Sequence, residues 1–398
     1  MKYKYLKLVK NKYFLLILFV LLTLLSCIDI RCVVNADNYD SSAEFSSSIV
    51  QIVDGLDLSE IESLMESIDD YGMIGSSIKD KVLDIINGKY YTNYSSLIDV
   101  IASIVLGDIR RLLPFVFTLV SVGILTNIIG GLKSDNSSSN SIVAFVCFSV
   151  VALMLIITLK DILNITKNTL GLIHNQMQII FPLLITLLST VGSVTTVSIY
   201  NPLVAVLTFL VSVVFDKVLY PLFIVVFLLV VVGGLSDTVK LNKLQGFLMS
   251  AFKWCIGIVF TVFTGFLSIQ GITAGKFDSV SIKATKFAIK SYIPIIGSYI
   301  SDGMDFIVLG SVLVKNTIGL IGILILFLTI LSPIVSIVLI KLALQLASGI
   351  IEMSGSGKIS SFINDCSKVL VYPIVLILGV SFMYLITIAL IMCTANVL

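Results

Sequence analysis

Long apolar runs separated by short polar stretches fill the chain after residue 110. A helix of about 20 residues spans the hydrocarbon core of a bilayer, and seven of the runs have about this length. These runs are Leu112–Leu132, Ser141–Leu159, Ile179–Ser198, Val218–Leu235, Trp254–Ile272, Thr317–Ile340 and Val369–Cys393. The pattern therefore predicts an all-α, polytopic helical membrane domain over residues 110–398.

Two further apolar stretches leave the number of spans open. Pro202–Phe215 would form roughly 21 Å of helix against a hydrocarbon core of about 30 Å. It is therefore either a short hairpin arm that turns at Asp216-Lys217 or a re-entrant segment. Tyr292–Leu313 is long enough to span, but Asp302 and Asp305 make a span costly unless they face protein or water. We expect about eight transmembrane helices, with about seven to nine compatible with the pattern.

The first 36 residues have the three parts of a secretory signal peptide. Several lysines precede the apolar run Phe14–Leu25, and small residues stand at Val34 and Ala36. Cleavage after Ala36 is the expected outcome. Two alternatives are that the run stays as an anchor, for which it is short, or that Leu24–Cys27 is a lipoprotein cleavage box, which Leu25 weakens.

Residues 37–109 are then an acidic extracytoplasmic helical segment. Asp37–Ser48 is polar and predicted to be disordered. Three short amphipathic helices follow: one begins with a capping box at Ser59 and Glu62, one covers Ser77–Ile86, and one runs from Ser96 to Gly107. So small a bundle is marginally stable, and we expect it to lean on a partner or on the membrane domain.

Composition and charge support this division. The chain of 398 residues is 57% hydrophobic and 13% charged, with a mean hydropathy of +1.09, which fits a protein whose main solvent is lipid. Residues 1–36 carry a net charge of +5, residues 37–109 carry −11, and residues 110–398 carry +8. Six scattered cysteines indicate no disulfide framework.

A basic amphipathic segment covers residues 274–291. Its lysines share one helical face, and apolar side chains lie elsewhere; they are Lys276, Lys283, Lys286 and Lys290. This face binds anionic lipid, is simply solvated, or docks an acidic partner such as residues 37–109, and interfacial binding is the preferred interpretation.

The basic segment also raises a question of topology. Ser236–Lys253 and Lys276–Lys290 are both basic and flank the single apolar run Trp254–Ile272, so both cannot be cytoplasmic if that run spans. Either the run is a re-entrant hairpin, or the lysine face meets something acidic on the outer side.

Residues that carry chemistry are few. His174 is the only histidine, which excludes a multi-histidine metal cluster. Ser354–Lys358 lacks the glycine and hydroxyl positions of a phosphate-binding loop. Asp216 and Lys217 form a candidate membrane polar pair, at a turn or on a transport path. We find no paired catalytic groups at membrane depth, and expect no enzymatic activity, metal, cofactor or nucleic-acid partner.

The stretch from Gly265 to Asp305 resembles the stage III sporulation protein AE family of endospore-forming bacteria. The residues that carry the resemblance are Gly265–Gly271, Ala284–Phe287, Ile293–Pro294, Gly297 and Ser301-Asp302. The resemblance implies a membrane subunit in the mother-cell membrane around the forespore. It also implies assembly with the other stage III sporulation AA–AH proteins and the forespore stage II protein Q into a secretion-like channel needed for forespore development.

The residues alone predict a polytopic membrane protein with a small acidic ectodomain, and the resemblance implies that it is a structural subunit, with membrane lipid and a membrane insertase during biogenesis as candidate partners. The alternative is a secondary transporter that acts on its own. The candidate interaction and assembly residues are Gly265, Gln270, Gly271, Lys276, Lys283, Lys286, Lys290, Pro294, Gly297, Asp302 and Asp305.

Overall fold

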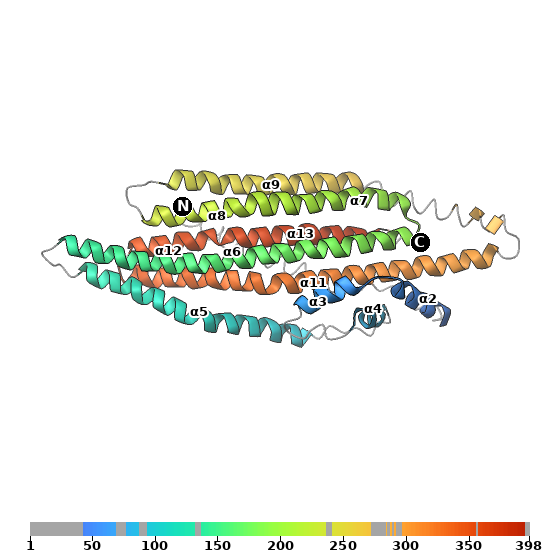
Figure 1. Ribbon diagram of the computed structural model, residues 1–398, viewed down its shortest axis with the longest axis horizontal. Coiled ribbons are helices and arrows are strands. Elements are labelled where there is room, and N and C mark those ends of the chain that lie inside the picture. The colour runs from blue at the N-terminus through green and yellow to red at the C-terminus, as the bar shows by residue number, and fades with distance from the viewer. Residues whose placement is uncertain are drawn as a thin grey trace, which may run out of the picture.

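The computed structural model describes residues 43–68, 77–86, 94–131, 137–235, 241–271, 284, 287–288, 290–291, 297–355 and 357–394. Within these ranges every regular element is a helix, so the predicted all-α class is confirmed. The helices lie nearly parallel to one long axis and form an elongated bundle (Figure 1).

Short helices precede the long ones along the chain. The N-terminal ones are α2 (Ala43–Asp54), α3 (Ser59–Ile68) and α4 (Ile78–Ile86). The bundle then consists of α5 (Tyr94–Gly131), α6 (Ser137–Thr190), α7 (Val194–Phe209), η2 (Leu210–Leu219), α8 (Tyr220–Leu235), α9 (Asn242–Gly271), α11 (Gly297–Met353), α12 (Gly357–Val369) and α13 (Val371–Cys393).

Six stretches of the described chain are long and apolar enough to cross a membrane, close to the expected number. The count is lower because predicted neighbours are parts of one helix. Ser141–Leu159 and Ile179–Ser198 both fall largely within α6, which continues through the polar residues Lys160–Asn168. None of those nine residues is proline or glycine, so polarity alone does not end the helix.

The predicted turn at Asp216-Lys217 is wrong. The chain passes from α7 through the π-helix η2 into α8 without a break, so Pro202–Phe215 is neither a hairpin arm nor a re-entrant segment. No helix breaker stands between Pro202 and Pro221. Lipid favours a continuous helix because its backbone groups are all bonded internally.

Three smaller expectations are also corrected. Ala43–Ser48 belongs to α2, although the polarity of this stretch predicts disorder. The helix expected from Ser96 and the first span form one helix, α5, because Pro114 is tolerated in its interior. The run Trp254–Ile272 is not a re-entrant hairpin, since residues up to Gly271 belong to the single straight helix α9.

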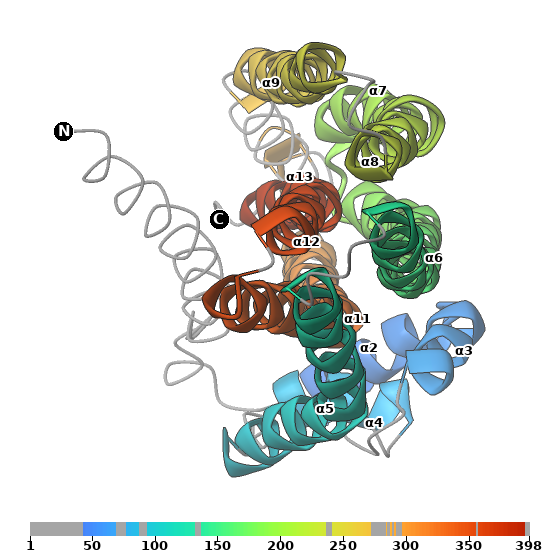
Figure 2. The same cartoon turned by 90° about the vertical axis from the view of Figure 1, so that its left-hand side faces the viewer.

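The core of the bundle is α11, which packs against α5, α6, α12 and α13 along its length and against α2, α3 and α4 near its start. Figure 2 shows these helices around it, with α9 on the outside. In the 18-residue apolar stretch of α11, 56% of the residues are buried inside the protein, whereas 11% are buried in the corresponding stretch of α5. The inner helices are therefore covered by protein, and the outer ones leave apolar faces to lipid.

Polar contacts fix α11 against its neighbours inside this apolar core. Gln176 of α6 donates from Nε2 to Thr329 Oγ1 at 2.6 Å. Ser348 and Ser360 each donate a hydroxyl to the other's carbonyl oxygen, both at 2.9 Å, and so join α11 to α12. Such bonds set the register of helices, because water does not compete for them in a dry interface.

Gly123 lets α5 approach α11 closely. A Cβ atom placed on Gly123 would lie 2.7 Å from the Cδ1 and Cγ1 atoms of Ile351, which is fully buried. Gly107, on the same helix, has no atom within 4 Å of the corresponding position.

We therefore expect Gly123→Ala to destabilise the bundle by about 1–3 kcal/mol through overpacking. Gly107→Ala, the matched control, should be neutral or stabilising by up to about 1 kcal/mol, since alanine favours helix. Thermal unfolding of the purified protein in detergent measures both. Equal unfolding midpoints for the two variants would contradict the close approach.

Candidate functional site in the acidic half of the bundle

The two halves of the bundle differ in what they carry. We call the half that holds α2–α4, α7, the start of α11 and the end of α13 the acidic half, at the right in Figure 1. The opposite half, which holds the connections α5–α6, α8–α9 and α11–α12, is the turn half. Most residues of the candidate site lie in the acidic half.

The helices α2–α4 are seated on α11 by apolar side chains. Ile49 and Ile52 of α2 lie against Gly310, where a Cβ would be 3.1 Å from Ile52 Cδ1. Ile61 of α3 and Val82 of α4 are fully buried. The acidic segment is thus joined to the membrane domain by an apolar interface, and its charged side chains are on the other faces.

The start of α3 is capped by Asp57 rather than by the predicted box at Ser59 and Glu62. Asp57 Oδ1 accepts the Ser59 N–H at 3.1 Å and the Ser59 hydroxyl at 2.5 Å. These two hydrogen bonds stabilise the charged form and lower the pKa of Asp57. The Glu62 N–H, which Ser59 would accept in a capping box, donates instead to the Leu58 carbonyl oxygen at 3.0 Å.

The outer surface of α2–α4 is acidic. Asp54 pairs with Lys79 at 2.8 Å, and Ser77 donates to Glu62 at 3.0 Å. Further carboxylates on these helices and on the α2–α3 connection are exposed, namely Asp57, Glu60, Glu66, Asp80 and Asp84. One exposed ion pair adds little stability. The carboxylates that Lys79 does not pair with form a negatively charged surface, which is suited to a basic partner.

Lys315 anchors the end of α13 in this half. Its side chain on α11 is fully buried, and its ammonium group donates to the carbonyl oxygen of Met392 at 3.2 Å and to that of Thr394. The last carbonyls of a helix have no partner within the helix, and a cation there also complements the helix dipole. Tyr200 of α7 donates to the Leu390 carbonyl at 3.4 Å in the same region.

The structure places the predicted assembly residues near the ends of two helices. Gly265, Gln270 and Gly271 belong to the last turns of α9, while Gly297, Asp302 and Asp305 belong to the first turns of α11. Gly265 is exposed, with no atom near its Cβ position. Lys290 is also exposed. Lys276, Lys283, Lys286 and Pro294 lie outside the described residues.

Asp216 and Lys217 are brought neither to a turn nor into the core. Both side chains are exposed on η2, in the middle of the continuous stretch Val194–Leu235. Asp216 and Lys217 therefore do not form a buried pair on a transport path in this structure.

Sequence inspection missed the groups that hold the acidic half together. Lys315 falls between two predicted apolar runs, Tyr292–Leu313 and Thr317–Ile340, so the pattern places it in a connection. Its isolation is a signal, because it is the only basic residue between Lys290 and Lys341. The bond from the Ser336 hydroxyl to Asp108 has no such signal, since it depends on how α5 crosses α11.

The arrangement is suited to holding neighbouring molecules. Among the described residues, no group of three or more His, Cys, Asp or Glu side chains is placed to bind a metal ion. An acidic surface, exposed helix ends and apolar outer faces are the features that the described part of the chain presents at its surface.

Fold and site together define a helical membrane protein with an acidic, peripherally packed N-terminal segment. The chain belongs to the stage III sporulation protein AE family, which matches residues 76–395. It is similar to stage III sporulation protein AE of Bacillus subtilis (strain 168), with 23% identity over 329 residues that cover 82% of each chain. No solved structure was found to match. The protein is thus a membrane-associated protein of a sporulation family.

We expect Lys315→Met to loosen the end of α13, because the carbonyls of Met392 and Thr394 would lose a buried donor. Amide hydrogen exchange in residues 385–394 should become faster, while exchange in α12 stays unchanged. Lys167→Met, at an exposed position of α6, is the control and should leave both regions as they are. Unchanged protection at the end of α13 in Lys315→Met would contradict the anchoring role.

Proposed function

We propose that this protein is a membrane-embedded structural and assembly subunit of the channel complex that links the mother cell and the forespore during sporulation. In this role it sits in the mother-cell membrane around the forespore after its signal peptide is removed, and it is required for forespore development. Its partners are the other stage III sporulation AA–AH proteins, the forespore stage II protein Q, membrane lipid and, during biogenesis, a membrane insertase.

One observation carries this proposal. The surfaces suited to contacts with partners gather in one half of a bundle of continuous helices. The acidic surface of α2–α4, the end of α9 and the start of α11 all belong to the acidic half. The connection between Gly271 and Gly297, which contains the lysines of residues 274–291, therefore joins two helix ends in that half. An acidic surface beside two helix ends that a lysine-rich connection joins suits a subunit that docks several partners on one side.

The direction of the helices supports an orientation. Six apolar stretches alternate in direction, so α2–α4 and the C-terminus of α13 lie on the same side of the membrane. That side is extracytoplasmic if the signal peptide is cleaved. The turn half then faces the cytoplasm with Lys243, Lys358 and Lys368, in keeping with the positive-inside rule.

This orientation predicts opposite accessibility for cysteines in the connections before and after α11. In a protein whose native cysteines are replaced by serine, Ser281→Cys should react with an impermeant thiol reagent added outside intact cells. Ser354→Cys, on the α11–α12 connection, should react only after the membrane is permeabilised. Labelling of both from the same side would contradict the orientation.

The assembly role predicts a defect from charge reversal in the basic segment. We expect Lys283→Glu with Lys286→Glu to abolish most co-purification with the other complex subunits, because each substitution replaces attraction to an acidic surface by repulsion. Insertion into the membrane should be normal. Lys240→Glu with Lys243→Glu, on the connection between α8 and α9, makes the same charge change at the opposite end.

Assembly and spore formation at normal levels in the Lys283/Lys286 variant would overturn docking through this face. Uptake of a solute by the purified protein alone in liposomes would favour the alternative, a secondary transporter.

A further inference from the structure

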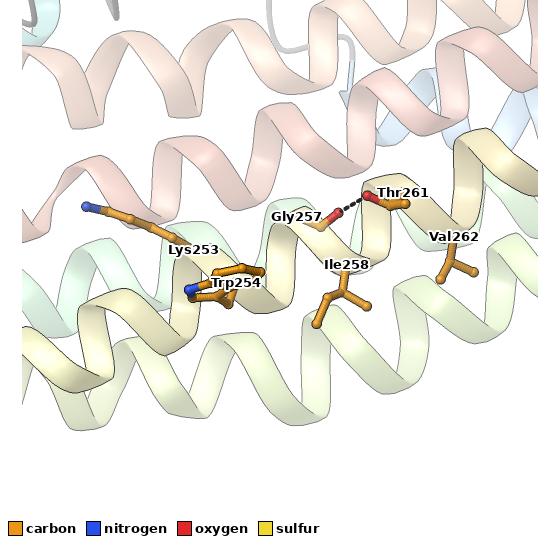
Figure 3. A pocket seen from close by; sticks show the side chains of 6 residues that line it. All are labelled: Lys253, Trp254, Gly257, Ile258, Thr261 and Val262. Atoms are coloured by element: carbon orange, nitrogen blue, oxygen red, sulfur yellow. Dashed lines mark hydrogen bonds between the residues drawn. The ribbon is translucent and has the colours of Figure 1, made fainter.

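Hydroxyl groups on the long helices often bond the backbone of their own helix. In the open hollow on the outer face of α9, between Lys253 and Val262, Thr261 donates to the Gly257 carbonyl at 2.8 Å (Figure 3). Five buried hydroxyls of the inner helices also donate to the carbonyl four residues earlier, namely those of Thr166, Thr169, Thr329, Ser381 and Thr387. A short hydroxyl side chain can therefore be buried on a helix with its donor satisfied.

Two longer polar side chains in the core have no such partner in their own helix. Gln176 of α6 and Tyr384 of α13 are both fully buried. The Gln176 amide donates to Thr329, but its Oε1 atom and the Tyr384 hydroxyl have no hydrogen-bond partner among the described residues. A buried polar atom without a partner costs more than an ordinary hydrogen bond contributes, so both atoms need one.

Helix contacts place Gln176 and Tyr384 at one level of the bundle. A Cβ atom on Gly322 of α11 would lie 3.0 Å from Ile180 Cδ1 of α6 and 3.3 Å from Ile388 Cδ1 of α13. Gln176 and Tyr384 stand four residues before these isoleucines, on the same faces of their helices. Because α6 and α13 run in the same direction (Figure 1), both side chains lie one turn from Gly322 towards the turn half.

The central helix brings Thr329 to the same level. It runs in the opposite direction, and Thr329 is seven residues beyond Gly322 on the same face. Side chains of α6 and α13 tilt back towards their N-termini, and so towards Thr329. The 2.6 Å bond from Gln176 to Thr329 fits this register, and the centroid of the Tyr384 ring lies 5.2 Å from that of Phe181 on α6. The polar ends of Gln176 and Tyr384 therefore lie at the level of the Thr329 hydroxyl.

The α11 side of this layer is the least crowded part of its stretch. Thr329 has the smallest side chain between Gly322 and Ser332, where every other residue is Ile, Leu or Phe. Its hydroxyl donates to the Ile325 carbonyl at 2.8 Å and accepts from Gln176, so one lone pair of its oxygen stays free. The layer thus presents polar atoms from three helices around a small side chain.

The unpaired atoms have the chemistry of a water site. A water molecule accepts from the Tyr384 hydroxyl, donates to Gln176 Oε1, and has a second hydrogen for the free lone pair of Thr329. Buried water molecules make about three such bonds. The match does not depend on which way the Gln176 amide is turned, because water accepts from an amide nitrogen as well as it donates to an amide oxygen.

We infer that one water molecule is bound between Gln176, Thr329 and Tyr384, as a fixed part of the core formed by α6, α11 and α13. It supplies a polar link from α6 to α13, in addition to the contact between the rings of Phe181 and Tyr384. Such a link helps to fix the register of three helices at one point. The site goes beyond the proposed function and holds whichever partners the protein has.

Oxidation by hydroxyl radicals tests the site directly. A short X-ray pulse forms these radicals from water, including water bound inside a protein, and they oxidise the side chains that touch it. The full-length protein in detergent is irradiated, and mass spectrometry measures the oxidation of each residue. We expect Tyr384 to be oxidised although it is fully buried, and Phe223 of α8, which is equally buried, to remain unoxidised. This measurement needs no substitution.

A pair of variants separates bound water from bulk water. Gln176→Leu keeps the size of the side chain and removes both polar atoms, so it should reduce the oxidation of Tyr384 to the level of Phe223. Gln178→Leu, the control, makes the same change at an exposed position of α6 and should leave Tyr384 oxidation as it is.

Three results would overturn the site. They are an unoxidised Tyr384 in the unsubstituted protein, which means a dry core; equal oxidation in Gln176→Leu, which means entry of bulk water; and equal loss of oxidation in both variants.

Thermal unfolding gives a second, independent readout. Tyr384→Phe removes one partner of the water and should lower the unfolding midpoint. In the Gln176→Leu background, which has already lost the water, Tyr384→Phe should leave the midpoint unchanged or raise it, because no bound molecule then depends on the hydroxyl. An equal fall of the midpoint in both backgrounds would contradict a shared water molecule.

Discussion

The structure depends on the enclosure of one very long helix. At 57 residues, α11 is nearly three times the length that a bilayer needs, and other helices cover it from the acidic half to the turn half. In lipid, the hydrophobic effect does not drive two apolar helices together, so their association must come from close packing and buried hydrogen bonds. The approach of Gly123 to Ile351 and the reciprocal bonds of Ser348 and Ser360 supply these at points far apart along α11.

The second constraint is that polar groups inside such a bundle need partners. The ammonium group of Lys315 satisfies the last carbonyls of α13, and Thr329 satisfies an amide hydrogen of Gln176. Each bond joins α11 to a different neighbour. The hydrogen bonds therefore also favour one arrangement of the helices over the others that apolar packing alone would allow. Loss of a partner leaves a buried donor or acceptor, which costs more than an average hydrogen bond contributes.

Hydropathy predicted the class of the protein because several apolar runs of span length in one chain are typical of membrane helices. It could not predict how the runs join. Lys160–Asn168 and Asp216-Lys217 both look like connections, yet each lies inside a continuous helix. Whether polar residues end a helix depends on breakers and on what covers them, and the apolar pattern encodes neither.

The candidate site was predictable to a similar extent. The acidic charge of residues 37–109 is plain in the sequence, and the pattern predicts α3 and α4 within a residue of their starts. Asp57 as the cap and Lys315 as the anchor depend on geometry. A carboxylate two residues before Ser59 competes with the predicted capping box, and only the three-dimensional structure shows that α13 ends beside Lys315.

Continuous helices also have a consequence for how the two halves communicate. Because α6 and α11 run unbroken from the acidic half to the turn half, the two halves are joined by packed helices and not by a hinge between separate segments. In the described part of α11 the interior proline is Pro333, where a kink is cheapest, and it is close in sequence to Ser336, whose bond to Asp108 holds α5 beside it. The point of α11 most able to bend is therefore braced by a neighbouring helix, so the two halves of the bundle are held in one arrangement.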